Sequence, residues 1–447
     1  MLNRDDNELI CRVGAGTPMG SFLREFWIPC LLTSELSAPD GPPVRVRLLG
    51  EDLLAFRVTS GAIGLAPHNC PHRGASLFFG RNEEEGLRCV YHGWKFDVDG
   101  RCVDMPNEPA GSNFKEKIRL RSYKTVERNG VIWAYMGTRE VPPPLPNIEP
   151  NMVPQSEVRY QKVLRECNWI QALEGDIDTS HLGFLHLGGI KPEDQKPGSF
   201  DFYTVNDRAP KYNAVETDYG TMYAAYRPAG EASYYWRFAQ YLMPFFTMIP
   251  TGVLGKQVLV RAWVPLDDTH MMFWSFALPR TLSTGQGDPP VGDPAHSPVR
   301  QNQPPLFEYL PGTSDWLGQW RLTQHQGNDY LIDRHVQQQN RGLAGYTGIS
   351  GIHQQDQALT ESMGPIMDRT REHLGTSDTM VIRTRRRLIN AVKEHRDLGV
   401  TPFPVDHPEV YEQRSGGAVL PREANWIDAT RDLRRAFVEH ADLTAHR

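Results

Sequence analysis

The first third of the chain is patterned as a series of short β-strands. Five runs of alternating or continuous β-forming residues are separated in several places by Gly or Asp-Gly turns: residues 44–49, 53–58, 86–90, 94–98 and 131–136. Alternation with a period of two and tight turns are typical of antiparallel hairpins. The pattern therefore predicts a small all-β sandwich or barrel at residues 25–140, preceded by an N-terminal arm at residues 1–24.

A proline-rich segment at residues 141–155 marks a change in the pattern, and its prolines favour a stiff linker. Further strand-like runs predict one sizeable antiparallel sheet: residues 158–163, 221–226, 236–241, 257–264 and 271–278. Helical patterns follow at residues 357–373, 377–396 and 423–441, and the prolines of residues 283–305 predict a long loop. We expect an α+β chain, in which residues 156–447 form a larger domain of antiparallel sheet and helices.

Charge and composition exclude two kinds of partner. The formal net charge of −6 provides no basic surface for nucleic acid. No apolar run reaches the roughly 20 residues that a membrane span requires. Six cysteines in 447 residues do not indicate a disulfide framework, and the N-terminus is too polar for a signal peptide. We therefore expect a cytoplasmic protein.

Two cysteine–histidine pairs lie within the predicted β domain, Cys70-Pro-His72 and Cys89-Val-Tyr-His92. Two cysteines and two histidines could also bind zinc. The flanking residues favour iron, because Cys-Pro-His-Arg-Gly-Ala and Cys-Val-Tyr-His-Gly-Trp closely resemble the two cluster-binding loops of Rieske proteins. The resemblance implies a [2Fe–2S] cluster in which Cys70 and Cys89 hold one iron while His72 and His92 hold the other.

A second candidate site lies at residues 174–186, where a helix is expected. Asp178 and His181 are three residues apart, which keeps them on one face of a helix. His181 and His186 are five apart, which a regular helix separates by roughly 140°. If both imidazoles bind one metal, the helix must be distorted between them, and Gly183 is where this costs least. On these residues alone, two surface histidines on an ordinary helix remain an equal alternative.

The Rieske-like loops followed by Asp-x₂-His-x₄-His resemble the α-subunits of Rieske non-heme iron aromatic ring-hydroxylating oxygenases. Residues 81–83 and 361–375 are similar to the phthalate 4,5-dioxygenase-like branch of that family. The resemblance implies a helix-grip-like catalytic domain in which His181, His186 and a downstream carboxylate bind a mononuclear Fe(II). Such a triad leaves coordination positions open for O2. Asp356 is our choice for the carboxylate, and Glu361 and Asp368 are alternatives.

The same resemblance implies a different role for Asp178. It would accept a hydrogen bond from His181 and form another with His92, or alternatively His72, of a neighbouring subunit. Electrons would then cross between subunits, which implies a homotrimer or a stacked hexamer built of α-subunits only. NAD(P)H would act only through a separate flavin and iron–sulfur reductase, with or without a ferredoxin.

The resemblance also implies an aromatic carboxylate as substrate and its dihydroxylation as the reaction, on a phthalate-like or halobenzoate-like ring. O-demethylation or aryl-ether cleavage of methoxylated or phenoxy acids is the alternative. A bound carboxylate needs cations or hydrogen-bond donors, so we expect Thr179, Arg208 and Arg237 to contact it, with Arg227 as a further candidate. A pure electron-transfer Rieske protein, a different class, would leave the second histidine site unexplained.

Overall fold

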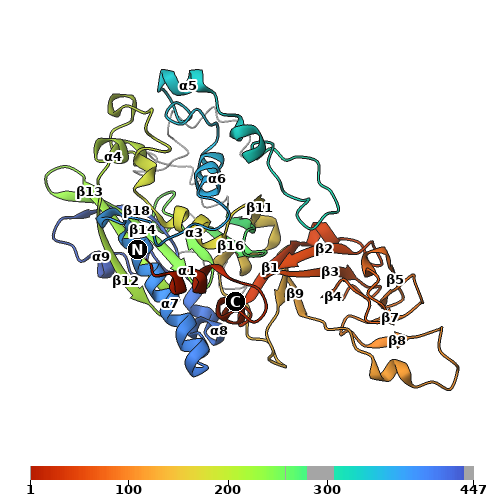
Figure 1. Ribbon diagram of the computed structural model, residues 1–447. Helices are drawn as coiled ribbons and strands as arrows, with labels where there is room; N and C mark the ends of the chain where they lie inside the picture. Colours follow the sequence, from red (N-terminus) through yellow and green to blue (C-terminus); the bar gives the residue numbers. More distant parts are fainter. Residues whose placement is uncertain (1, 257, 279–306, 437–447) are drawn as a thin grey trace.

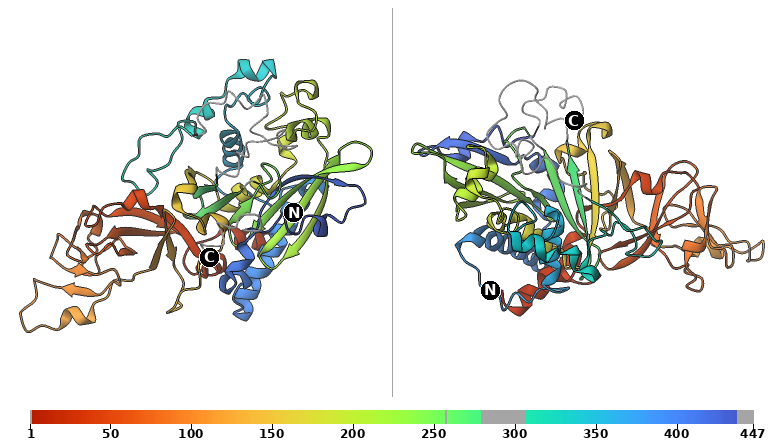
Figure 2. Two further views of the ribbon diagram at one scale, coloured as in Figure 1. Left: turned by 180° about the vertical axis from the view of Figure 1, so that it is seen from behind. Right: turned by 90° about the horizontal axis from the view of Figure 1, so that it is seen from above.

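The computed structural model describes residues 2–256, 258–278 and 307–436 and has two lobes that lie side by side (Figures 1 and 2). Short strands build the smaller, N-terminal lobe, and the main sheet and most helices build the larger one. The predicted loop at residues 283–305 lies outside the described residues. Within those residues, no helix is both long and apolar enough to cross a membrane.

Three small antiparallel sheets form the smaller lobe. The first has the order β1 (Trp27–Leu32), β10 (Val131–Tyr135), β9 (Lys124–Arg128), and the second β2 (Val44–Leu48), β3 (Glu51–Arg57), β4 (Ile63–Pro67). The third has the order β5 (Arg81–Glu83), β6 (Gly86–Arg88), β7 (Lys95–Phe96), β8 (Cys102–Asp104). Every pairing is antiparallel, which confirms the predicted all-β architecture.

One eight-stranded antiparallel sheet forms the centre of the larger lobe. Its order is β11 (Arg159–Arg165), β17 (Met271–Ala277), β16 (Leu259–Pro265), β15 (Phe246–Met248), β14 (Ser233–Leu242), β13 (Gly220–Pro228), β12 (Lys211–Thr217), and β18 (Gly416–Pro421) also pairs with β14. The sheet confirms the predicted α+β class. Strand β18 was missed because it begins with Gly416 and Gly417, which carry no side-chain pattern.

The chain also forms helices. They are α1 (Arg4–Cys11), α2 (Pro18–Leu23), α3 (Trp169–Ile177), α4 (Phe200–Asn206), α5 (Arg334–Gln339), α6 (Ile352–Ser362), α7 (Thr379–Leu398), α8 (Phe403–Asp406) and α9 (Trp426–Ala429). Of these, α3, α4 and α7 contact the sheet. The N-terminal arm contributes α1 and α2, which pack on α7. Buried residues of α7 such as Met380, Thr384 and Leu388 recur every four positions, so one face of the helix packs on β12 and β13.

Two of the three helical predictions hold only over part of their length. Residues 377–396 form α7 as predicted. Of residues 357–373, only the part up to Ser362 is helical, because Gly364 adopts φ +90° and Pro365 cannot continue a helix. Within the described part of residues 423–441, α9 is the only α-helix.

The two lobes share one hydrophobic core. Trp133 of β10 stacks on Phe276 of β17 with ring centroids 6.3 Å apart, and both belong to the same cluster of buried residues. The proline-rich segment packs on the larger lobe, because Glu149 is fully buried and accepts hydrogen bonds of 2.8 and 2.7 Å from Arg414. The segment at residues 141–155 is therefore a packed strap between the lobes rather than a free spacer. A second, smaller core lies beneath the cysteine–histidine loops.

Candidate active site

The two cysteine–histidine loops have the same backbone conformation. In the first, Cys70 N donates to Ala75 O at 2.8 Å and Gly74 N donates to Cys70 O at 2.9 Å. The second loop repeats both bonds at the same lengths from Cys89 and Gly93. The φ angles of Gly74 and Gly93, +75° and +82°, lie in the left-handed region that favours glycine. This repeated turn places Cys70 and Cys89 alike, whereas His72 lies two residues after its cysteine and His92 three residues after its own.

The four predicted cluster ligands lie together. The rings of His72 and His92 are 4.3 Å apart between centroids, and His72 stacks on Trp94 at 4.4 Å. Burial and the neighbouring Cys89 thiol raise the pKa of the Cys70 thiol to about 11. The Nδ1 atom of His72 is buried without a hydrogen-bond partner among the described residues. Two adjacent thiols, two adjacent imidazoles and an unpaired buried nitrogen fit the donor set of a Rieske cluster.

The second candidate site begins where α3 ends. The helix ends at Ile177, because Asp178 already has extended φ and ψ angles of −77° and 117°. The prediction of one helix through both histidines is therefore wrong. A 3₁₀ turn at His181–Gly183 follows, and Leu187 N then donates to Leu182 O, five residues earlier, at 3.0 Å. The expected distortion near Gly183 is present, but it lies beyond the helix.

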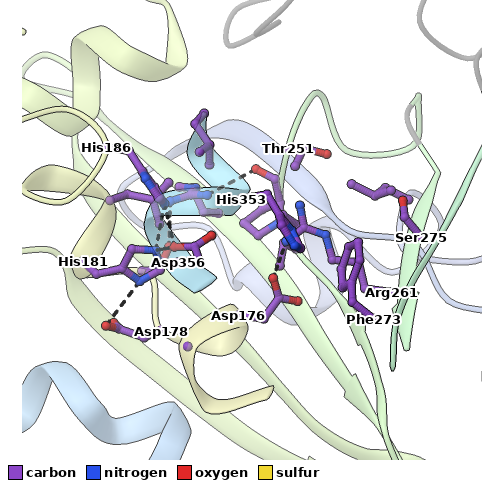
Figure 3. Close-up of a pocket in the computed structure, with 18 of the residues that line it drawn as sticks. Asp176, Asp178, His181, His186, Thr251, Arg261, Phe273, Ser275, His353 and Asp356 are labelled. Carbon is purple, nitrogen blue, oxygen red and sulfur yellow. Dashed lines mark hydrogen bonds and ion pairs between the residues drawn. The ribbon is translucent and has the colours of Figure 1, made fainter. Parts of the chain in front are cut away.

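Three side chains converge here: His181 and His186 from the turn segment, and Asp356 from α6. The Nε2 atoms of the two histidines are 3.2 Å apart, and Asp356 Oδ1 lies 3.5 Å from the first and 3.1 Å from the second. Candidate ligand atoms of all three residues lie within 4.8 Å of one another (Figure 3). Two imidazoles and a carboxylate converging on one point fit a cation between them, and a two-histidine, one-carboxylate set is typical of mononuclear Fe(II).

Asp178 contacts the opposite side of the His181 ring. Its Oδ2 lies 3.4 Å from His181 Nδ1, and its Oδ1 accepts hydrogen bonds of 2.7 and 2.8 Å from the backbone N–H and hydroxyl of Ser180. Burial disfavours the charged form of Asp178, but these partners outweigh it, and the pKa of the carboxyl is lowered. The carboxylate is therefore fixed by its own turn and orients the His181 ring.

Gln355 holds the second histidine and was not predicted. Its Oε1 lies 2.7 Å from His186 Nδ1, and its Nε2 donates to the carbonyl oxygens of Leu343 and Ile349, each at 2.9 Å. Because both ends of the amide are engaged, the His186 ring has a fixed orientation. A glutamine on a helix carries no distinctive sequence signal, although its position next to Asp356 could have suggested it.

The structure does not bring the alternative carboxylates, Glu361 and Asp368, to the histidines. Glu361 is buried and accepts hydrogen bonds from Glu166 N at 2.8 Å, from Gln357 Nε2 at 2.9 Å and from the Tyr330 hydroxyl. Asp368 is exposed and bonds to Thr370. Asp356 is thus the candidate that the fold places beside His181 and His186.

A cavity of about 320 Å³ lies beside the three converging residues. Thr179 and Arg237 line it, and Arg237 Nη1 donates to Thr179 Oγ1 at 2.6 Å. Arg208 and Arg227 are not among its lining residues, because they bond to backbone carbonyls elsewhere. Arg261 also lines the cavity and was missed, since an arginine in an alternating strand is usually interpreted as solvent-facing.

Sequence comparison identifies two families along the chain. Residues 26–124 match the Rieske [2Fe–2S] domain, and residues 134–289 and 307–443 match the LigXa C-terminal domain like family. The chain is 46% identical over 427 residues to the 3-chlorobenzoate-3,4-dioxygenase oxygenase subunit of Comamonas testosteroni, covering 95% of this chain and 96% of the relative. It is 38% identical to the phthalate 4,5-dioxygenase oxygenase subunit of Pseudomonas putida, with coverages of 88% and 86%.

More distant relatives and solved structures agree with this result. The 5,5'-dehydrodivanillate O-demethylase oxygenase subunit of a Sphingobium species is 30% identical over 406 residues, covering 88% of this chain and 81% of the relative. The crystal structure of dicamba monooxygenase bound to dicamba has the same fold, with a TM-score of 0.55 at 16% identity over 84% of this chain and 99% of that one.

The chain belongs to the Rieske aromatic ring-hydroxylating oxygenases, as an oxygenase α-subunit. It is an oxidoreductase whose cofactors are a Rieske [2Fe–2S] cluster and a mononuclear iron, with O2 as co-substrate. As the oxygenase subunit of a multicomponent system, it receives electrons from separate proteins.

Proposed function

We propose that the protein dihydroxylates an aromatic carboxylate of the phthalate or halobenzoate type. The observation that carries this proposal is the cavity beside His181, His186 and Asp356, which is lined by aromatic side chains and by Arg237. An apolar cavity with a few placed polar groups is typical of a small-molecule site. The named substrates of the two most similar relatives described above are aromatic carboxylates and support the same class.

In this proposal, Cys70, His72, Cys89 and His92 hold the Rieske cluster, and His181, His186 and Asp356 hold the mononuclear iron. When bound, the cluster supplies single electrons and the iron offers open positions for O2. Asp178 orients the His181 ring from the side opposite to the iron. It also forms the contact to a Rieske histidine of a neighbouring subunit.

The substrate carboxylate is bound by Arg237, whose guanidinium is set by its 2.6 Å bond to Thr179 and by stacking over Phe200 at 4.4 Å. A guanidinium can donate two parallel hydrogen bonds to a carboxylate. Phe200, Phe273 and Phe307 form an apolar wall that excludes water from the ring. Arg208, the other predicted contact, donates to the carbonyl oxygens of Leu187 and Ile190 and does not line the cavity.

The proposed assembly is a homotrimer or stacked hexamer of this chain, because Asp178 needs a histidine from another subunit. A flavin and iron–sulfur reductase, directly or through a ferredoxin, transfers electrons from NAD(P)H in the cytoplasm. We also propose the division of the chain into a Rieske domain at residues 25–140 and a catalytic domain at residues 156–447, with residues 1–24 as an arm and 141–155 between the domains.

An O-demethylase or aryl-ether-cleaving activity on methoxylated or phenoxy aromatic acids is the second candidate. It is favoured by two relatives, the 5,5'-dehydrodivanillate O-demethylase oxygenase subunit and the phenoxybenzoate dioxygenase subunit alpha of Ectopseudomonas oleovorans, 31% identical over 338 residues. The two activities differ in product, a vicinal cis-diol in one case and a phenol in the other.

Turnover with identified products tests both proposals. Purified protein, a generic phthalate-type reductase and NADH are incubated with phthalate isomers, chlorobenzoates, phenoxybenzoates and methoxybenzoates. We expect a cis-diol or its rearomatised catechol from at least one phthalate or chlorobenzoate. Only phenols and aldehydes would favour the second candidate. No oxygenated product from any acid, with both metal centres loaded, would refute the substrate class.

A further inference from the structure

A short row of polar side chains crosses the sheet within the cavity. Gln161 on β11, Ser275 on β17 and Arg261 on β16 are direct cross-strand partners, Gln161 with Ser275 and Ser275 with Arg261. All three line the cavity. Cross-strand partners present their side chains on the same face of a sheet, so the three form one continuous polar line.

Apolar residues border this row on both sides. The cavity-facing positions two residues away along β16 and β17 include Leu259 and Ala277 on one side and Phe273 on the other. The row is therefore a narrow polar strip in an otherwise apolar wall. In Figure 3, Arg261 and Ser275 lie on the side of the cavity away from His181, His186 and Asp356.

The charge of Arg261 is already balanced. Its Nη1 donates to Asp176, whose other carboxylate oxygen accepts a 2.5 Å hydrogen bond from Thr247. The Nε atom of Arg261 is buried and lacks a hydrogen-bond partner among the described residues. Within those residues, no hydrogen bond engages the side chains of Gln161 or Ser275 either. The strip therefore offers several N–H and O–H donors without a net positive charge.

We propose that this strip is a second substrate subsite, which binds an uncharged oxygen substituent on the ring of the aromatic acid. The inference rests on the proposed function, because Arg237 on β14 binds the carboxylate. An acceptor oxygen of a hydroxyl, methoxy, carbonyl or amide group can accept a hydrogen bond from the Ser275 hydroxyl or the Gln161 amide, which line the cavity. The second carboxylate or the halogen of such a substrate binds elsewhere in the cavity, because a carboxylate at the strip would face Asp176 and a halogen is too weak an acceptor for these donors.

The substrate class is thereby narrowed. Within the phthalate and halobenzoate class, an acid that also carries a neutral oxygen substituent should bind more tightly than the same acid without it. One good hydrogen bond in a buried site corresponds to about a tenfold change in affinity, or about 1.4 kcal/mol. We expect a preference of this size for the substrate whose substituent reaches the strip.

Equilibrium binding tests the subsite without turnover. The holoenzyme is titrated anaerobically by calorimetry with benzoate and with its hydroxy, methoxy, chloro and carboxy derivatives at each ring position. Two variants keep Asp176 in contact with a cation: Ser275→Ala and Arg261→Lys. Thr251→Val, which removes a hydroxyl elsewhere on the cavity wall, is the matched control.

In the wild type, we expect one hydroxy- or methoxybenzoate to bind at least tenfold more tightly than benzoate. Each of the two strip variants should reduce this ratio at least fivefold and change benzoate affinity less than twofold, and Thr251→Val should leave the ratio unchanged. Benzoate binding as tightly as every hydroxy- and methoxybenzoate would overturn the inference, as would an equal effect of Thr251→Val. If no aromatic acid binds at all, the proposed function itself fails.

Discussion

Replacing Glu174 by glutamine should strongly destabilise the larger lobe. Glu174 is buried on α3 and bonds to Arg369, at 3.0–3.2 Å, and to Arg385 of α7, at 2.5 and 2.9 Å. Arg385 also pairs with Glu372, so it keeps one carboxylate after the substitution. Arg369 is fully buried, and Glu174 is the only described carboxylate in contact with it.

The expected loss in the free energy of unfolding follows from this difference between Arg369 and Arg385. Leaving one buried ion without its partner costs about 3–5 kcal/mol. Because Arg385 keeps its contact with Glu372 and only Arg369 loses its carboxylate, we expect a loss of stability near the lower figure, about 3 kcal/mol. The assay is urea unfolding at neutral pH followed by far-UV circular dichroism, in which the midpoint should fall at an unchanged slope. The visible absorbance of the Rieske cluster should survive in the native variant, because the loops lie in the other lobe.

Glu8→Gln is the matched control. Glu8 pairs with Arg12 at 2.7 Å, but both side chains are more than 40% exposed. An exposed pair contributes 0–1 kcal/mol, so this variant should unfold close to the wild type. If Glu174→Gln and Glu8→Gln unfold at the same urea concentration, the buried network does not hold α3 in place.

Three further variants test other parts of the structure. His181→Ala should lose mononuclear iron and turnover while the Rieske absorbance and EPR signal persist, and bleaching of the cluster would refute the assignment of this histidine. Asp178→Asn should keep about three iron atoms per chain yet slow single-turnover product formation tenfold or more, because an amide cannot replace the carboxylate on His181; an unchanged rate counts against the bridge. Asp267 should make unfolding acid-sensitive: burial raises its pKa, but hydrogen bonds with His270 and Thr269 outweigh this and lower it to about 2. Because the pKa of Asp267 is lower in the folded than in the unfolded protein, its carboxylate stabilises the fold fully above pH of about 4. This stabilisation is lost as the pH falls toward 2 and amounts to at most about 2 kcal/mol. Asp267→Asn should abolish that part of the pH dependence, measured as urea midpoints between pH 5 and pH 2.

The sequence predicted the features that depend on short-range pattern. Alternation predicted half of the strands in the smaller lobe and most of those in the larger lobe, and local spacing with the flanking residues predicted Cys70, His72, Cys89 and His92 as cluster ligands. Asp356 was chosen over Glu361 and Asp368 only by resemblance, and the fold brings it to the histidines because α6 packs on α3. The strand predictions were correct where the periodicity lies within a few residues.

Features that depend on tertiary contacts were missed. The end of α3 at Ile177 could not be predicted, because Asp178 leaves the helix to bond with its own turn at Ser180. Arg261 alternates with apolar residues like a solvent-facing arginine, and only the sheet register brings it beside Ser275 in the cavity. Gln355 likewise has no signal of its own. The roles of Arg261 and Gln355 are created by partners distant in sequence, whereas the end of α3 is set by a local turn that the helical pattern did not predict.

The shared core between the lobes limits how the protein can be divided. Trp133 of β10 is buried against Phe276 of the larger lobe, and Ile148 of the strap is buried in the same cluster. A fragment that ended near residue 140 would expose this apolar face to water and would tend to aggregate. Chimeras that graft the N-terminal domain of a relative therefore need matching residues on β17, on the strap and at Arg414. Exchange of the two lobes between relatives should succeed only when the residues on both sides of their shared core come from the same parent.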